Sequence, residues 1–256
     1  MLLLVYKPIN IMKGVIYMAQ RRDSLESRKR ILSACVKLFI ENGYTNTTMS
    51  EIISEANVSN STFQNLFHSK SGVLMDLIEF MFTNQFKAAN QLAGSGIKPV
   101  YIYAVETSIQ MTLTELNENL REIYLEAYTF PQSAEYIYQK TSSELYRIFG
   151  SYLPEYRESD FYELEIGTAG IMRNYMAKPC DKYFTLEKKL ERFLTMSLSA
   201  FSVPKEEQKE VLDYMLSINI RSTANAVMQA LFHELAMKFD FELDENENIN
   251  KMEVLA

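Results

Sequence analysis

Residues 44–70 of the chain read YTNTTMSEIISEANVSNSTFQNLFHSK, and this stretch decides the fold. Thr48 and Glu51 have the spacing of a capping box, which predicts that a helix begins just after Thr48. Ser59 is a suitable N-cap for a further helix, and only a short turn separates it from the first one. Two short helices joined by a turn of about three to four residues form a helix-turn-helix.

Apolar residues at helical spacing predict another helix on each side of this stretch. The helix before it spans about 24–41 and ends at Asn42-Gly43, where glycine suits the left-handed conformation. The helix after it begins behind Ser69. The residues expected to face the core from these two helices are Ile31, Leu32, Cys35, Leu38, Phe39, Val73, Leu74, Leu77, Ile78, Met81 and Phe82.

The second helix of the helix-turn-helix has a small and polar outer face. Such a face can enter the major groove of DNA and hydrogen-bond base edges and phosphates. An ordinary helical subdomain with a solvated face has the same pattern, and the pattern alone does not separate the two. The side chains of this face are Asn60, Ser61, Thr62, Gln64 and Asn65.

A longer series of residues at matching spacing resembles the DNA-binding domain of the tetracycline-repressor (TetR) family over about residues 24–82. The resemblance implies an all-helical homodimer. In that family an N-terminal domain binds a palindromic operator, and a C-terminal domain binds a small effector that releases the DNA. The residues that carry the resemblance are Arg30-Ile31-Leu32-Ser33-Ala34-Cys35, Leu38-Phe39, Glu41-Asn42-Gly43-Tyr44, Thr47-Thr48-Met49, Ile52, Ala56-Asn57-Val58-Ser59, Thr62-Phe63, Phe67 and Ser69-Lys70.

The resemblance also implies roles for single residues. Thr48 is expected to contact phosphate through its hydroxyl and backbone N–H, and Lys70 to contact phosphate or steer the domain toward it. Arg28 and Arg30 could add phosphate contacts, although solubility accounts for them equally well. The start of the recognition helix is expected to face the groove at Ser59, Asn60 and Thr62.

The chain departs from the family inside the recognition helix. Ser61 stands where the family has glycine, Gln64 where it has tyrosine, and Asn65 where it has an aromatic or basic residue. Glutamine and asparagine can hydrogen-bond phosphate or read adenine. We expect both to face DNA, with base or phosphate left open. The DNA-binding candidates are therefore Arg28, Thr48, Ser59, Asn60, Thr62, Gln64, Asn65 and Lys70.

Charge is distributed unevenly along the 256 residues, whose formal net charge is −7. Residues 18–75 carry seven Lys/Arg and five Asp/Glu, whereas residues 76–256 carry 17 bases and 28 acids. A modestly basic segment is thus followed by an acidic body, which limits indiscriminate binding to nucleic acid. DNA binding must depend on a few well-placed contacts.

Helical periodicity continues beyond residue 83, and thirteen of the sixteen tyrosines follow residue 100. Tyrosine combines apolar area with one polar tip, which suits a cavity for an amphipathic ligand as well as an ordinary core. Polar residues inside apolar runs are more informative. Arg173 is expected to face inward and to bind a carboxylate, either an internal one or one on the ligand. The ligand-binding candidates are Tyr103, Glu106, Tyr124, Tyr128, Met172 and Arg173.

The resemblance further implies a dimer interface made by a four-helix bundle of the last two long helices of each subunit. The apolar stripes of those helices could equally belong to the core. The interface candidates are Leu190, Phe193, Leu194 and Phe201 on one helix and Val227, Met228, Leu231 and Phe232 on the other.

Little in the sequence supports an enzyme. Two cysteines and two histidines leave no metal site or disulfide framework to argue, and no glycine-rich phosphate loop is present. We therefore expect no catalytic residue, no metal and no cofactor. A helical adaptor without DNA binding, or less favourably a helical enzyme, remains the alternative to a ligand-responsive repressor.

The sequence predicts an all-α protein in four parts: a non-native or disordered extension (1–17), a helix-turn-helix DNA-binding domain (18–70), a helical effector-binding and dimerisation domain (71–240) and an acidic frayed tail (241–256). Codons for residues 13–15 can contain a bacterial ribosome-binding sequence, so we expect translation to start at Met18. No apolar run has the length of a membrane span, and a cytoplasmic location is expected.

Overall fold

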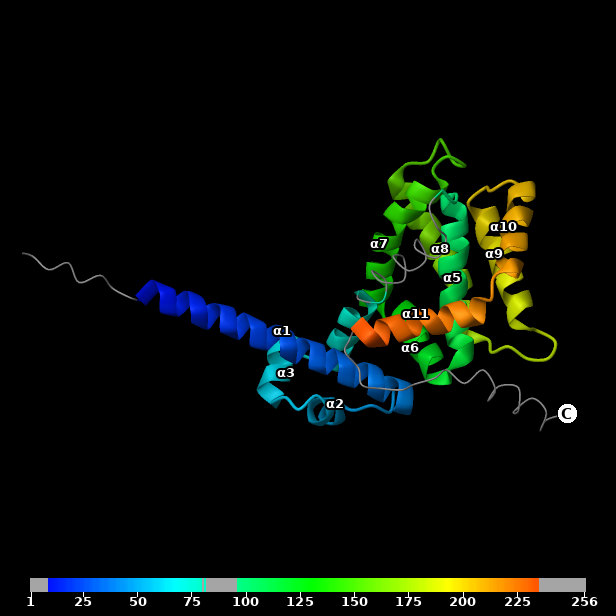
Figure 1. Ribbon diagram of the computed structural model, residues 1–256. Coiled ribbons are helices and arrows are strands. Elements are labelled where there is room, and N and C mark those ends of the chain that lie inside the picture. Colours follow the sequence, from blue (N-terminus) through cyan, green and yellow to red (C-terminus); the bar gives the residue numbers. More distant parts are fainter. Residues whose placement is uncertain (1–8, 80, 82–95, 235–256) are drawn as a thin grey trace, which may run out of the picture.

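The computed structural model describes residues 9–79, 81 and 96–234, and within them all regular structure is helical (Figure 1). The predicted all-α class is confirmed. Residues 70–79 and 81 are helical. The other helices are α1 (Ile9–Asn42), α2 (Met49–Glu55), α3 (Asn60–Leu66), α5 (Pro99–Leu116), α6 (Glu118–Thr129), α7 (Pro131–Phe149), α8 (Glu158–Ala177), α9 (Leu186–Ala200), α10 (Lys205–Ser217) and α11 (Ile220–Glu234).

The predicted caps of the helix-turn-helix are confirmed. The Thr48 hydroxyl accepts a hydrogen bond from the Glu51 backbone N–H, while the Glu51 carboxylate accepts one from the Thr48 backbone N–H, so α2 begins with a capping box. The Ser59 hydroxyl accepts from the Thr62 N–H and caps α3. Phe63 anchors α3 in the core of this domain and is fully buried.

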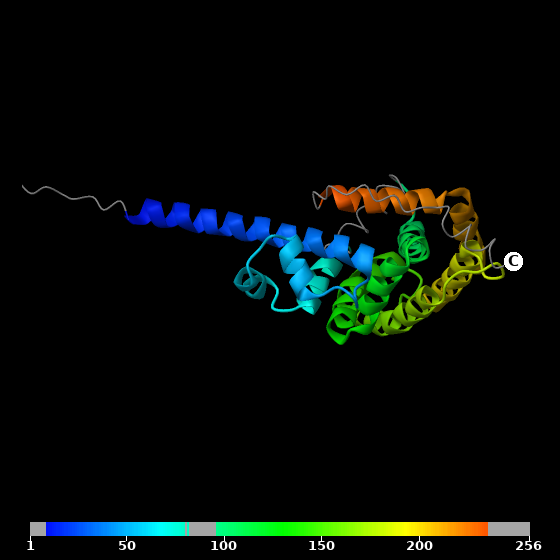
Figure 2. The ribbon, with the colours of Figure 1, turned by 90° about the horizontal axis from the view of Figure 1, so that it is seen from below.

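Helix α1 is longer than predicted, since it begins at Ile9 and not near residue 24. The sequence between residues 18 and 24 contains no helix breaker, and Pro8 stands directly before Ile9, where proline favours a helix start. The expectation of disorder is therefore wrong for residues 9–17, and residues 1–8 lie outside the described part. The N-terminal end of α1 projects away from the other helices (Figures 1 and 2).

Helix α5 is the centre of the second part of the molecule, because residues 102–115 are all buried. It packs against α6, α7, α8, α9, α10 and α11, and α11 crosses it (Figure 1). An aromatic cluster completes this core: the Phe149 and Phe201 rings stack with their centroids 4.2 Å apart, and Tyr103 meets Phe149 edge-on at 5.0 Å. Ile218 and Asn219 separate α10 from α11.

The proposed interface residues of α9 and α11 belong to this core, which corrects their assignment. Leu190, Phe193, Leu194, Phe201, Val227 and Met228 are all buried within the single chain. An apolar stripe shows that one face of a helix is covered, but it does not show whether the same subunit or a partner covers it. The side chains of Leu231 and Phe232 lie outside the described part.

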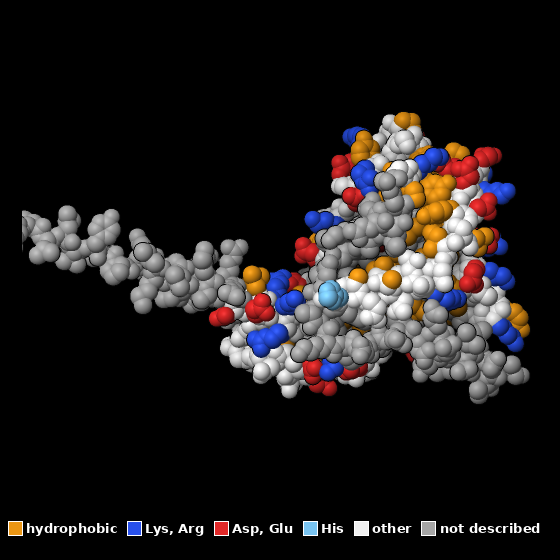
Figure 3. All heavy atoms as spheres, in the orientation of Figure 1, with side chains coloured by type: hydrophobic (Ala, Val, Ile, Leu, Met, Phe, Trp, Pro, Cys, Tyr) orange, Lys and Arg blue, Asp and Glu red, His pale blue; other side chains and the backbone are white. Residues whose placement is uncertain are grey.

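The surface is mixed in character. On the face drawn in Figure 3, hydrophobic side chains gather over α5, and basic and acidic side chains are interspersed near the helix-turn-helix. None of the described helices combines the length and hydropathy that a membrane crossing requires.

Candidate nucleic-acid interface and ligand cavity

Helix α3 presents the predicted polar face to solvent. Asn60, Ser61 and Asn65 are exposed, and Thr62 and Gln64 are half-buried. Within the described part of the chain the Gln64 and Asn65 side chains make no hydrogen bond, so both can bind a DNA group without breaking one. The Ser59 hydroxyl, by contrast, is already engaged as the cap of α3.

A side chain of α1 contacts the turn between α2 and α3. Asn57 has φ +50, a left-handed conformation that asparagine tolerates well. The Arg30 guanidinium donates to the Asn57 carbonyl oxygen at 3.1 Å. Arg30 therefore fixes the angle at which α3 leaves the turn.

Arg28 and Lys70 each bind groups of the same chain in this structure, and their expected contacts with phosphate stay predictions. Arg28 forms an ion pair with Asp76, and its guanidinium lies 5.2 Å from the centroid of the Phe67 ring. The Lys70 ammonium donates to the carbonyl oxygens of Tyr44 at 2.8 Å and Thr47 at 2.9 Å. Both residues brace the helix-turn-helix from within, and their partners are too distant in sequence to be found from local patterns.

Helix α6 is attached to the DNA-binding domain at the end of α1. The Glu122 carboxylate accepts hydrogen bonds from the backbone N–H groups of Tyr44 and Thr45, both at 2.9 Å. The Asn119 amide donates to the Ile40 carbonyl oxygen at 2.7 Å. Gly43 permits this approach: its φ is +83, and a Cβ there would lie 2.5 Å from the Glu122 carboxylate.

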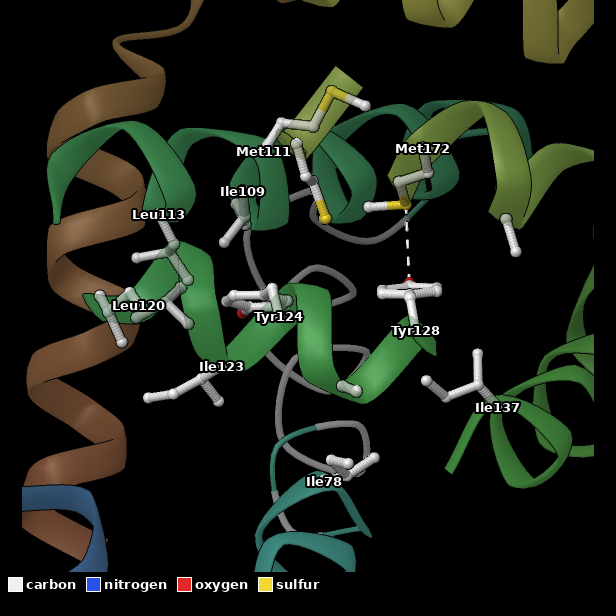
Figure 4. Close-up of a cluster of buried hydrophobic side chains, with 14 of the residues drawn as sticks. Ile78, Ile109, Met111, Leu113, Leu120, Ile123, Tyr124, Tyr128, Ile137 and Met172 are labelled. Carbon is white, nitrogen blue, oxygen red and sulfur yellow. Dashed lines mark hydrogen bonds between the residues drawn. The ribbon is translucent and has the colours of Figure 1, made fainter. Parts of the chain in front are cut away.

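A cavity lies between α5, α6, α7 and α8. The part that the centre of a water molecule can reach measures about 20 Å³, which is enough for roughly one or two waters. Figure 4 shows Tyr128 of α6 and Met172 of α8 pointing toward each other, and the Tyr128 hydroxyl donates to the Met172 sulfur at 3.6 Å. The lining residues are Tyr103, Glu106, Thr107, Gln110, Tyr128, Thr141, Glu144, Leu145, Ile148, Glu165, Thr168, Ala169 and Met172.

Four of the six predicted ligand residues line this cavity: Tyr103, Glu106, Tyr128 and Met172. Two predictions are corrected. Tyr124 is buried outside the cavity, on the part of α6 near Leu120 and Leu113 (Figure 4). Arg173 does not face inward, because its guanidinium donates to the Thr129 hydroxyl near the surface at 2.9 Å.

Six polar cavity residues are absent from the predicted ligand set, namely Thr107, Gln110, Thr141, Glu144, Glu165 and Thr168. Glu165 was hidden by the acidic residues around it, which suggest a solvated face. Its spacing from the buried Phe161 and Met172 was the available signal, because all three fall on one side of α8.

The cavity contains two acidic groups with unusual proton affinity. Burial raises the pKa of Glu106 to about 7, although a hydrogen bond from Gln110 opposes the change. Burial also raises the pKa of Glu165 to about 8, and the nearby Glu106 charge adds to this rise. The described residues contain no cluster of His, Cys, Asp and Glu that could hold a metal ion.

Comparison with known proteins agrees with this architecture. Residues 31–77 match the family model described as bacterial regulatory proteins, tetR family. The chain is 29% identical over 97 residues to YuxN (38% of this chain, 31% of the relative) and 28% identical over 163 residues to YerO (59% and 55%). It is 35% identical over 68 residues to YvkB (27% and 36%). All three are named uncharacterized HTH-type transcriptional regulators of Bacillus subtilis (strain 168).

The matched regions span from about a third to just over half of the length of these relatives. Among solved structures, RolR in complex with resorcinol has a similar fold, with a TM-score of 0.58 at 17% identity over 75% of this chain and 95% of that one. The helix-turn-helix, its two caps and the family match lead to one conclusion: residues 31–77 are similar to the helix-turn-helix region of the tetR family of bacterial regulatory proteins.

Proposed function

We propose that the protein is a ligand-responsive transcriptional repressor that binds a palindromic operator as a homodimer and leaves it when a small amphipathic effector binds. The observation that carries the proposal is that one helix, α6, contributes Tyr128 to the cavity and Glu122 to the attachment of the helix-turn-helix. RolR, which shares the fold, was crystallised with the small ring compound resorcinol. Residues 18–70 would bind the operator, and the helices from residue 71 on would bind effector and partner.

DNA recognition is assigned to the exposed face of α3, and Gln64 tests it. Gln64→Ala is expected to weaken operator binding by about 1–3 kcal/mol, or roughly 5- to 150-fold, if its amide reads a base. The measurement is fluorescence anisotropy with a DNA fragment that the protein selects from a random pool. The matched control is Gln139→Ala, an exposed glutamine of α7.

Mismatched DNA separates the two modes of contact. A base contact predicts that Gln64→Ala relaxes the preference at one position, whereas a phosphate contact predicts uniform weakening across sequences. An affinity equal to that of the control variant would contradict the assignment of Gln64 to DNA.

The dimer surface is proposed to be the outer face of α8 and α9. Ile166 and Met196 are each 47% exposed there, and the two helices pack side by side. A Cβ added at Gly167 or Gly170 would meet no atom within 4 Å, so these glycines lie on open surface. A two-fold dimer pairs one patch with itself, and small residues let helices approach closely.

Glutamate substitutions on this face of α8 and α9 are expected to dissociate the dimer. In Ile166→Glu/Met196→Glu, like charges would meet across the two-fold axis at a cost of several kcal/mol, on the order of a hundredfold or more in dissociation constant. Sedimentation velocity checks the mass. Leu216→Glu is the control, because Leu216 is an exposed apolar residue on α10 and not on α8 or α9. A double variant that remains dimeric, or a control that dissociates, would place the interface elsewhere.

A further inference from the structure

We propose that the cavity between α5, α6, α7 and α8 binds an organic cation, an amphipathic amine or quaternary ammonium compound whose charge lies against the carboxylates of Glu106 and Glu165. This inference rests on the proposed function, because it names the chemical class of the effector.

Two buried carboxyl groups without a cationic partner carry the argument. Glu106 and Glu165 are 3% and 6% exposed. Among the described residues each accepts one side-chain hydrogen bond, Glu106 from the Gln110 amide and Glu165 from the Thr168 hydroxyl at 2.9 Å. Neither forms a salt bridge with a described residue, and the described residues that line the cavity include no Lys, Arg or His. An ionised carboxylate buried in this way is costly until a cation joins it.

The cavity lining also offers a polar group and aromatic rings to an amphipathic ligand. The Thr141 hydroxyl oxygen is buried, lines the cavity and has no hydrogen-bond partner among the described residues. This is an independent sign that the cavity has an unmet polar contact. The rings of Tyr103 and Tyr128 add apolar area and can attract a cation through their faces.

A cationic ligand and protons compete for the carboxylates of Glu106 and Glu165. Because the pKa of Glu106 is raised to about 7 and that of Glu165 to about 8, the cavity without ligand holds protonated carboxyl near neutral pH. The groups that line the cavity with them are Tyr103 from α5, Tyr128 from α6 and Glu144 from α7, and Glu144 forms an ion pair with Arg147, which is outside the lining. Affinity for a permanent cation is therefore expected to rise between pH 6 and 8, as the two carboxyls ionise.

Isothermal titration calorimetry with two isosteres tests the charge. Phenyltrimethylammonium and tert-butylbenzene have the same shape, but only the first is charged. At pH 8 we expect the cation to bind at least about tenfold more tightly, which corresponds to about 1.4 kcal/mol. Glu106→Gln/Glu165→Gln is expected to remove that preference while leaving tert-butylbenzene binding unchanged. The control is Glu163→Gln, an exposed carboxylate on the same helix as Glu165.

Thermal unfolding shows whether the double variant Glu106→Gln/Glu165→Gln is folded, so that a loss of binding can be assigned to the missing charges. The two raised pKa values mean that the native state holds extra protons between about pH 4.5 and pH 7–8, so its stability falls as pH rises through that interval. Without these carboxyls the variant should unfold at a higher temperature than the wild type at pH 8. A folded double variant that still prefers the cation would overturn the inference.

Resorcinol supplies the uncharged alternative. If resorcinol or tert-butylbenzene binds at least as tightly as the cation at pH 8, the effector is a neutral ring compound and the inference fails. Binding to the selected DNA fragment, measured without ligand, keeps the two proposals separate. Cation binding without DNA binding would defeat the repressor proposal alone, and DNA binding without cation binding would defeat this inference alone.

Discussion

Glu115→Gln is expected to lower the free energy of unfolding by about 3–5 kcal/mol, since it leaves a buried ammonium without its counter-charge. The Lys189 side chain is fully buried, and its ammonium lies 2.5 Å from the Glu115 carboxylate. The same carboxylate accepts a hydrogen bond from the Cys180 backbone N–H at 2.9 Å and lies 3.5 Å from the Arg121 guanidinium. Glu115 thus connects α5, α6, α9 and the loop before α9.

The measurement is urea denaturation followed by circular dichroism. Glu115→Gln/Lys189→Met removes both charges and should recover much of the loss, because an apolar replacement of a buried pair is often close to neutral. Glu187→Gln is the surface control: its pair with Arg221 is about half exposed and should change stability by less than about 1 kcal/mol. A loss in Glu115→Gln no greater than in that control would show that the cluster does not hold these helices together.

This cluster also shows where sequence reasoning stops. Glu115 and Lys189 are 74 residues apart, and Lys189 lies in a charged run, residues 187–189, that suggests a solvated surface. Its helical spacing from Leu186 and Phe193 places it on the buried face of α9. Periodicity contained that information, but the identity of the partner depends on tertiary packing.

The helix-turn-helix could be predicted because its determinants are local. A capping box joins residues three positions apart, and an N-cap acts on the first turn of its own helix. Thr48 and Ser59 therefore needed no knowledge of the rest of the chain. The intramolecular partners of Arg28 and Lys70 could not be predicted, because a free and a paired cation look the same in sequence and these partners lie on other elements.

Local sequence patterns also predicted part of the cavity lining. Glu106 and Tyr128 were recognised because polar atoms interrupt apolar runs, while Glu165 stands among other acids. Arg173 was misplaced by about one position around α8, enough to bring it to the surface beside Thr129. Helical spacing shows roughly which side of a helix a residue occupies, but it does not show whether a residue at the edge of the buried face is buried or exposed.

Glu122→Ala is expected to abolish most of the release of DNA by effector. Glu122 and Tyr128 stand six residues apart on α6, about 9 Å along the axis. The cavity is too small for a ring compound as it stands, so a ligand must displace lining side chains, and Tyr128 of α6 is one of these. Movement of α6 reaches the Tyr44–Thr45 backbone through the Glu122 carboxylate, just before the cap of α2. Without that contact, ligand binding in the cavity should no longer change DNA binding by the helix-turn-helix.

The quantity to measure is the ratio of DNA affinities with and without phenyltrimethylammonium, or with whichever ring compound binds the cavity. A coupling of about 1–3 kcal/mol gives a ratio of roughly 5 to 150 in the wild type, and Glu122→Ala should bring it close to one. DNA affinity without ligand and ligand affinity without DNA should each change by less than about threefold, because each site stays intact. Glu118→Gln, an exposed acid on the same helix, should retain the wild-type ratio. Since coupling is reciprocal, DNA must lose its effect on ligand affinity to the same extent in Glu122→Ala. An undiminished ratio in that variant would mean that the signal reaches α3 by another route, such as the helical residues 70–79.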